Sequence, residues 1–142
     1  MTGGDDSESS DSVLRAVARS PDVPLLEGRR VAQFRVLRKI ASGGMGTVYE
    51  AEDENLARRI ALKVLARSTD PALHPRFLRE ARMASRINHP NVATIFDAGE
   101  TGDIAYIAME LVEGETLRCW SHGSRTLRER LTVVRQIAAA LA

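Results

Sequence analysis

The sequence predicts an α+β fold, in which a five-stranded antiparallel sheet with one inserted helix is followed by two further helices. Three observations lead to this prediction. Short β-type segments separated by turns fill residues 34–65. An apolar pattern of helical period occupies residues 70–88, and two more β-type segments follow it. The helical period then returns briefly near residue 117 and, after a loop at residues 121–125, again in a last helix that reaches the end of the sequence.

Length and composition exclude several classes of protein. The chain has 142 residues, which is enough for one domain or for part of a larger one. Its net charge is +1 and its pI is about 8.0, so composition gives no support for nucleic-acid binding. The sequence has no apolar run that could cross a bilayer and no signal-peptide pattern. Cys119 is the single cysteine, which excludes an internal disulfide, leaves no metal-ligand spacing and favours the cytoplasm.

Residues 1–30 are predicted to form a leader outside the fold. Residues 1–12 contain four acidic residues, no basic residue and several serines and glycines, a composition typical of disorder. Residues 13–20 are compatible with a short helix, which Pro21 and Pro24 would end.

A glycine cluster follows the first strand, which is predicted at residues 34–40. Gly43, Gly44 and Gly46 lie within four positions and lead directly into a second strand at Thr47. Because glycine has no Cβ atom, such a turn lets backbone N–H groups approach phosphate oxygens closely. The glycines lead into a strand and are not followed by Gly-Lys-Ser/Thr, which argues against a dinucleotide-binding fold and a P-loop. A plain tight hairpin is the alternative interpretation at this point.

Lys63 stands in the apolar third strand, predicted at residues 58–65. A lysine in such a strand either faces water or needs a counter-charge, because burying an unpaired charge is costly. The helix of residues 70–88 supplies a candidate, since Glu80 lies at the centre of its apolar stripe. The stripe comprises Leu73, Phe77, Glu80, Ala84 and Ile87. We therefore predict an ion pair between Lys63 and Glu80.

The rest of the chain completes the sheet and adds two helices. His89-Pro90-Asn91 ends the inserted helix, and strands are predicted at residues 92–97 and 104–111, with a turn at 99–103. Residues 113–116 break the last strand, and a short helix is predicted around residues 117–120. A capping box at residues 126–129 begins the final helix. One face of that helix carries Leu127, Leu131, Val134, Ala138 and Leu141, and the sequence offers little to cover it.

These segments together resemble the N-terminal lobe of a protein kinase, especially of the bacterial serine/threonine type, over residues 34–142. Residues 41–48 resemble the glycine-rich loop, with Ala41 in place of its first glycine. Ile60-Ala61-Leu62-Lys63 resembles the third-strand lysine motif, and Arg79-Glu80-Ala81 resembles the segment that bears the paired glutamate. Asn88-His89-Pro90-Asn91 is similar to the family's turn into the fourth strand. Residues 109–114 resemble the gatekeeper and the hinge.

The resemblance implies a kinase N-lobe at residues 31–112 and, at residues 113–142, the exit of the hinge and the start of a truncated C-lobe. It also implies an ATP site in which Lys63 holds the α- and β-phosphates, with Glu80 as its catalytic partner. Met109 would close the back of the adenine pocket, and the Glu110 carbonyl and Val112 amide would bind the adenine edge. The implied nucleotide-binding residues are Ala41, Ser42, Gly43, Gly44, Met45, Gly46, Val48, Ala61, Lys63, Met109, Glu110, Val112 and Thr116.

The chain lacks two motifs that the resemblance leads one to expect. It has no His-Arg-Asp and no Asp-Phe-Gly, so the family's catalytic base and principal magnesium ligand are absent. We expect the chain alone to be inactive, with Mg²⁺ bound only in a complete domain. Two interpretations stay open. The favoured one is a fragment of a cytoplasmic kinase that phosphorylates protein Ser/Thr hydroxyls with ATP. The alternative is a natural half-domain that serves as a nucleotide-binding or interaction module without catalysis.

Overall fold

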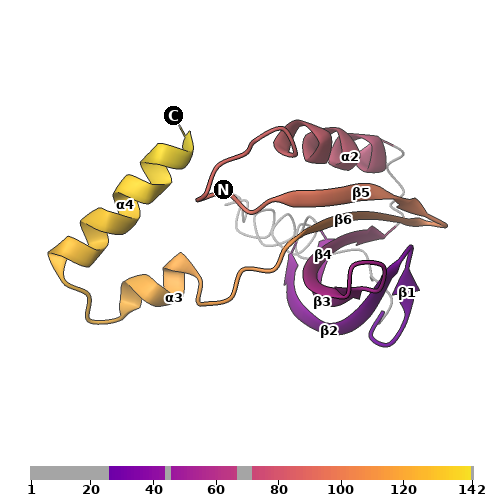
Figure 1. The fold of residues 1–142 in the computed structure, drawn as a ribbon, viewed down its shortest axis with the longest axis horizontal. Coiled ribbons are helices and arrows are strands. Elements are labelled where there is room, and N and C mark those ends of the chain that lie inside the picture. The colour runs from indigo at the N-terminus through magenta and orange to yellow at the C-terminus, as the bar shows by residue number, and fades with distance from the viewer. Residues whose placement is uncertain (1–25, 44–45, 67–71, 142) are drawn as a thin grey trace, which may run out of the picture.

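The computed structural model describes residues 26–43, 46–66 and 72–141, which form a curled antiparallel sheet, one helix packed on it and two helices beside it (Figure 1). The strands are β1 (Arg30–Val31), β2 (Phe34–Gly43), β3 (Gly46–Asp53), β4 (Arg58–Ala66), β5 (Ile95–Thr101) and β6 (Ile104–Glu110). The helices are α2 (Leu73–Ala84), α3 (Leu117–His122) and α4 (Leu127–Leu141). The strand order is β1-β2-β3-β4-β6-β5, and all neighbouring strands are antiparallel.

The main core lies on the inner face of the curled sheet. Side chains alternate between the two faces of a strand, so alternate residues in the first part of β2, in β3 and along β4 reach this core. Its members are Leu26, Val31, Phe34, Val36, Tyr49, Ala51, Ile60, Leu62, Val64, Tyr106 and Ala108. The rings of Phe34 and Tyr106 meet edge to face, with their centroids 5.7 Å apart. The Tyr106 hydroxyl donates a hydrogen bond to Asp97 Oδ2 at 3.2 Å, and burial raises the pKa of this phenol.

Helix α2 packs on the opposite face of the sheet. Phe77 and Ala81 are its buried residues, and they join a second core with Leu65, Ala105 and Ile107. The predicted position of this helix between the third and fourth long strands is confirmed, and Leu73 and Phe77 of the predicted stripe pack toward the sheet, but the centre of the stripe is wrong. Its middle residue, Glu80, has a side chain that is 60% exposed. The small side chain of Ala81 allows α2 to approach the sheet closely, so the helix turns Ala81 rather than Glu80 inward.

Several predicted boundaries shift. The sheet has a sixth strand, β1, because Val31 and Phe34 pair across a short turn ahead of the first predicted strand. Helix α2 ends at Ala84, earlier than predicted, and Ser85 N–H donates to the Ala81 carbonyl at its C-cap. Strand β5 begins at Ile95 rather than at residue 92, since a turn comes first, in which Val92 N–H donates to the His89 carbonyl at 3.0 Å. The predicted leader lies mostly in residues 1–25, outside the described residues. Its last part, residues 26–30, was wrongly placed outside the fold, because Leu26 is buried in the main core and Arg30 pairs with Arg35.

The capping box predicted for the last helix is confirmed. The Thr126 N–H donates to Glu129 Oε2 at 2.7 Å, and the Glu129 N–H donates to Thr126 Oγ1 at 3.3 Å. The Thr126 backbone N–H holds the pKa of Glu129 below its ordinary value. The apolar face of α4 is exposed, and with α3 it borders an open groove of about 580 Å³ lined by Trp120, Val134 and Ile137 among others. No helix among the described residues is long and apolar enough to cross a membrane.

Candidate functional site

The pairing of β3, β4 and β6 brings four predicted nucleotide-binding residues together. Val48 of β3 stands opposite Lys63 of β4, which stands opposite Ile107 of β6. Ala61 stands opposite Met109 on the same two central strands. Residues directly opposite each other in antiparallel strands share a face, and so do residues two apart along a strand. Val48, Ala61, Lys63 and Met109 therefore all lie on the face of the sheet that packs against α2.

Gly46 allows β3 to pass very close to β4. Its φ angle is +107°, a value that side-chain-bearing residues rarely adopt. A Cβ atom built at this position would overlap the Val64 carbonyl oxygen and would lie 3.1 Å from the Val64 carbonyl carbon. Gly43 is different, because a Cβ atom there meets no other atom within 4 Å and its φ is not positive. Of the two described loop glycines, only Gly46 has a backbone conformation and surroundings that require glycine.

The strand ends around the glycine turn continue the ladder. Ala41 pairs with Val48, and the hydroxyls of Ser42 and Thr47 lie 3.2 Å apart across the two strands. Ala41 thus lies in β2 beside Val48, directly after a register shift between Lys39 and Ala41. Its φ angle is not positive, so its replacement of the family's first glycine is compatible with the observed backbone. Gly44 and Met45, two further predicted binding residues, lie outside the described residues.

Lys63 is half-buried between the sheet and α2, with its Nζ 5.7 Å from the centroid of the Phe77 ring. The ion pair predicted between Lys63 and Glu80 is not formed in this structure. Glu80 Oε1 instead accepts a hydrogen bond from Arg76 Nε at 3.0 Å, one turn earlier on the same helix. A pair between residues four apart forms within one helix, and the orientation of α2 directs Phe77 rather than Glu80 toward Lys63. Within the described residues Lys63 has no carboxylate partner.

Glu110 ends β6, and the connection to α3 starts after it. Its backbone N–H donates to the Thr94 carbonyl at 2.8 Å, and its side-chain Oε2 accepts from the Thr94 N–H at 3.1 Å. Val112, another predicted hinge residue, is exposed. Thr116 has a role that was not predicted from the sequence: its hydroxyl accepts a hydrogen bond from the Cys119 N–H at 3.2 Å and caps α3. A threonine just before a predicted helix is the sequence signal of such a cap.

A buried carboxylate on the same face was also missed. Glu50 stands opposite Ala61, and its side chain is only 7% exposed because Arg38 of β2 and Arg59 of β4 both pair with it. The hydrogen bond from Arg59, with the nearby charge of Arg38, lowers the pKa of Glu50. Its signal in the sequence is a glutamate within β3 with arginines on both flanking strands.

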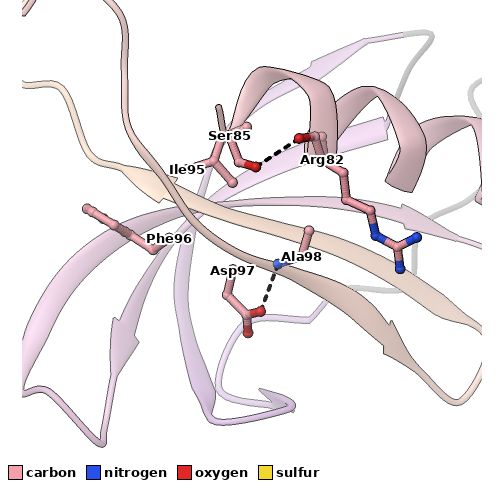
Figure 2. Close-up of a pocket in the computed structure, with 7 residues that line it drawn as sticks. Arg82, Ser85, Ile95, Phe96, Asp97 and Ala98 are labelled. Carbon is pink, nitrogen blue, oxygen red and sulfur yellow. Dashed lines mark hydrogen bonds between the residues drawn. The ribbon is translucent and has the colours of Figure 1, made fainter. Parts of the chain in front are cut away.

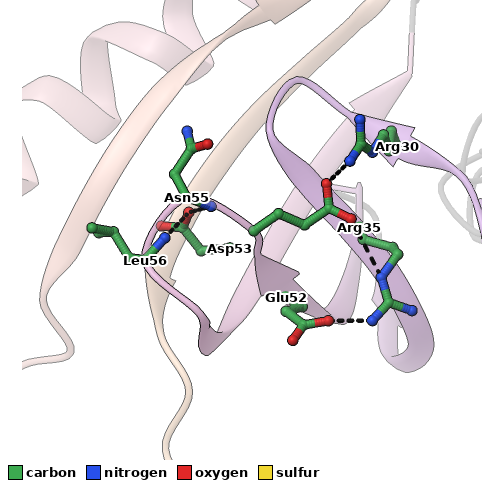
Figure 3. Close-up of polar contacts among 7 residues, drawn as sticks. Arg30, Arg35, Glu52, Asp53, Asn55 and Leu56 are labelled. Carbon is green, nitrogen blue, oxygen red and sulfur yellow. Dashed lines mark hydrogen bonds and ion pairs between the residues drawn. The ribbon is translucent and has the colours of Figure 1, made fainter.

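Figure 3 shows how the charged contacts continue from there toward the end of the β2–β3 hairpin. Arg35 pairs with Glu52, and Arg30 pairs with Glu54. Asp53 closes the turn into β4, because its Oδ1 accepts from the N–H groups of Asn55 and Leu56 at 3.1 and 3.3 Å. These contacts join β1, β2 and β3 at the end of the sheet away from the glycine turn.

A pocket of about 140 Å³ lies elsewhere, between the end of α2 and β5 (Figure 2). Arg82 and Ser85 line it from the helix side, and Phe96 and Asp97 line it from β5. Its polar groups are satisfied locally, since Ser85 Oγ donates to the Arg82 carbonyl and Asp97 Oδ1 accepts from the Ala98 N–H. None of the predicted binding residues contributes to it, so the face carrying Lys63 is the better candidate.

Comparison with known proteins agrees with the resemblance found in the sequence. Residues 34–142 match the family model "Protein kinase domain". The serine/threonine-protein kinase PrkC of Bacillus subtilis is 42% identical over 123 residues, which cover 83% of this chain and 19% of PrkC. The serine/threonine-protein kinase PknA of Mycobacterium tuberculosis is 43% identical over 118 residues, which cover 77% of this chain and 27% of PknA.

The fold gives the same result. The crystal structure of the PknI kinase domain of Mycobacterium tuberculosis superposes with a TM-score of 0.68 at 30% identity, covering 83% of this chain and 49% of that one. This chain therefore spans about half of that kinase domain and a smaller share of the curated relatives. The family model covers most of the chain. The sheet of this chain, its helix α2 and the start of a second lobe are arranged as in that kinase domain. The chain belongs to the protein kinase family, among relatives named as serine/threonine-protein kinases.

Proposed function

We propose that this chain is the ATP-binding part of a protein kinase that transfers the γ-phosphoryl group of ATP to serine and threonine hydroxyls of proteins. The main support for this proposal is that four side chains lie together on one face of the sheet, next to the glycine turn. They are Val48, Ala61, Lys63 and Met109. In this proposal residues 31–112 are the N-lobe and residues 113–142 begin the C-lobe. A cytoplasmic location belongs to the same proposal, since ATP is found there and Cys119 is a free, exposed thiol.

The residues present fit a nucleotide. Val48 and Ala61 offer small apolar side chains suited to the faces of adenine, while Met109 would limit the depth of the pocket. Lys63 is a half-buried cation with no carboxylate partner among the described residues. A phosphate oxygen would supply the missing counter-charge, and such charge-assisted hydrogen bonds are strong. Gly46 keeps the backbone free of a side chain at the neighbouring turn.

Within the complete protein, each residue would hold or orient a part of ATP. Lys63 would fix the α- and β-phosphates, and Glu80 would leave Arg76 and orient Lys63 once α2 turns toward the sheet. The Glu110 carbonyl and the Val112 N–H would bind the adenine edge, and the turn at residues 43–46 would cover the phosphates. Mg²⁺, when bound, neutralises charge that develops on the phosphates. Its ligands and the catalytic base would come from outside this chain, which would be inactive alone.

The test uses the full-length protein with a Lys63→Met substitution and Lys39→Met as the matched control. Lys39 is an exposed lysine of β2 with no assigned role in the site. Transfer of labelled γ-phosphate from ATP to a serine- and threonine-containing protein should fall at least about 100-fold for Lys63→Met, because preorganised charge at the phosphates is lost. Lys39→Met should stay near wild type, and both variants should keep the wild-type circular dichroism. Full activity of a folded Lys63→Met protein would overturn the assignment.

A further inference from the structure

The hydrogen bonds between Thr94 and Glu110 depart from the regular antiparallel pattern. Ile95 and Met109 are paired in the β5–β6 ladder, so Thr94 and Glu110 form the next position along it. In a hydrogen-bonded antiparallel pair, each residue donates its N–H to the carbonyl of the other. Here Glu110 N–H donates to the Thr94 carbonyl at 2.8 Å, as the pattern requires.

The reciprocal bond is made by a side chain. Thr94 N–H donates to Glu110 Oε2 at 3.1 Å and not to the Glu110 carbonyl. The carboxylate therefore occupies the place that the residue's own carbonyl would take if the ladder continued. A backbone N–H at this position seeks an acceptor, and a charged oxygen is a stronger one than a neutral carbonyl.

The segment that carries Thr94 is itself anchored. Asn91 N–H donates to His89 Nδ1 at 3.1 Å, and Asn91 Nδ2 donates to the Gln136 carbonyl of α4 at 3.0 Å. Thr94 thus belongs to a short segment tied at one end to α4 and at the other to β6. Glu110 is the last residue of β6, beyond which the chain leaves the sheet.

We propose that the side chain of Glu110 is a positioning residue that takes the Thr94 N–H so that the Glu110 carbonyl remains available to the adenine amino group. This inference rests on the proposed function, in which that carbonyl is the adenine acceptor. Without the carboxylate, the Thr94 N–H turns to the carbonyl and extends the ladder by one bond. The amino group of adenine then shares this carbonyl with the Thr94 N–H and is held more weakly, while guanine, which carries an oxygen at the same position, loses nothing.

The test compares the full-length wild type with Glu110→Ala and Glu110→Gln. Glu110→Ala should raise KM for ATP by about threefold to tenfold, the effect of losing one hydrogen bond, and should leave kcat within about twofold. The preference for ATP over GTP should fall by the same factor. Glu110→Gln should restore both, because its amide oxygen can accept from Thr94. General destabilisation would affect both nucleotides equally and would not change their ratio.

Glu115→Ala is the control, since Glu115 is an exposed glutamate of the same connection whose carboxylate pairs with Arg125 and does not contact the β5–β6 ladder. An unchanged ATP-to-GTP ratio in Glu110→Ala, or a Glu110→Gln variant as impaired as Glu110→Ala, overturns the inference. NMR scalar coupling across the hydrogen bond gives a readout that needs no activity. Coupling from Thr94 N to the backbone carbonyl carbon of residue 110 should appear only in Glu110→Ala. If the wild type binds no ATP, the proposed function fails, while this coupling still decides whether the side chain replaces the carbonyl.

Discussion

Glu80 pairs with Arg76 on the surface of α2, with 3.0 Å between Arg76 Nε and Glu80 Oε1, and not with Lys63. Both side chains are exposed, and an exposed pair one helical turn apart contributes only about 0.3–0.5 kcal/mol. Lys63 already lies on the face of the sheet that α2 covers. In the proposed function a modest rotation of α2 exchanges one partner of Glu80 for the other, so that Arg76 would compete with Lys63 for the carboxylate.

Removing the competitor should favour the Lys63–Glu80 pair. In the full-length protein we expect Arg76→Ala to change the free energy of unfolding by less than about 0.5 kcal/mol and to leave kcat/KM unchanged or up to about twofold higher. Arg82→Ala, an exposed arginine of the same helix, serves as the control. Urea unfolding and ATP-dependent phosphoryl transfer measure the two effects. A clear loss of activity in Arg76→Ala alone would show that Arg76 supports the site instead of competing for Glu80.

The two described glycines of the turn should respond differently to alanine. Gly46→Ala forces a side chain into a positive φ and against the Val64 carbonyl, so we expect a loss of about 1–3 kcal/mol or more in the free energy of unfolding. Gly43→Ala meets no atom within 4 Å and should change stability by less than about 1 kcal/mol. Equal effects of the two substitutions in denaturant unfolding would show that the close approach of β3 to β4 relaxes easily.

Acid should weaken the sheet through Glu50. Its pKa is lower in the folded chain than the ordinary value of 4.5, so the folded state gains stability that is fully present above that value. As the pH falls from about 4.5 through the lower folded pKa, this stability is lost. Glu50→Gln should be less stable than wild type at neutral pH and should lose less on acidification. Thermal melts between about pH 3 and pH 7 test this, and parallel pH profiles for the two proteins would contradict it.

Replacing a leucine by alanine should lower the free energy of unfolding strongly in the sheet and only slightly in α4. Leu62 is fully buried in the main core, and Leu62→Ala should reduce the free energy of unfolding by about 2–5 kcal/mol. Leu131 on α4 is 54% exposed, and Leu131→Ala should cost less than about 1 kcal/mol in this chain. Chemical denaturation of both variants gives the comparison. A large effect of Leu131→Ala would mean that α4 packs against a surface in solution.

The predictable part of the site is the part that strand alternation determines. Placing Lys63 and Ala61 two residues apart in one strand already assigned them to one face, and the structure agrees. The capping box at Thr126 was equally predictable, because its two hydrogen bonds join residues that are only three apart in the sequence. Features that depend only on the spacing of residues close in the sequence can therefore be predicted from the sequence.

Contacts that depend on how two elements are placed relative to each other could not be predicted from the sequence. Helical spacing allows a stripe through Phe77 to continue at Glu80 or at Ala81, and only the docking of α2 on the sheet decides for Ala81. The burial of Glu50 needs one arginine from each of its two neighbouring strands. One of them, Arg38, comes opposite Glu50 only because the register of β2 shifts between Val36 and Arg38. Such irregularities leave no periodic mark in the sequence.

Helix α3 holds both the single tryptophan and the single cysteine of the chain, next to each other at Trp120 and Cys119. Tryptophan emission therefore reports on the environment of α3 and its groove with α4, where Arg125 lies 5.2 Å from the indole ring. Unfolding of the sheet is spectroscopically separate, because its buried aromatic side chains are tyrosine and phenylalanine. One thiol-directed dye beside one indole gives a short-range quenching pair at the groove. The same sample can then report separately, by optical means, on what covers α4 and on whether the sheet is intact.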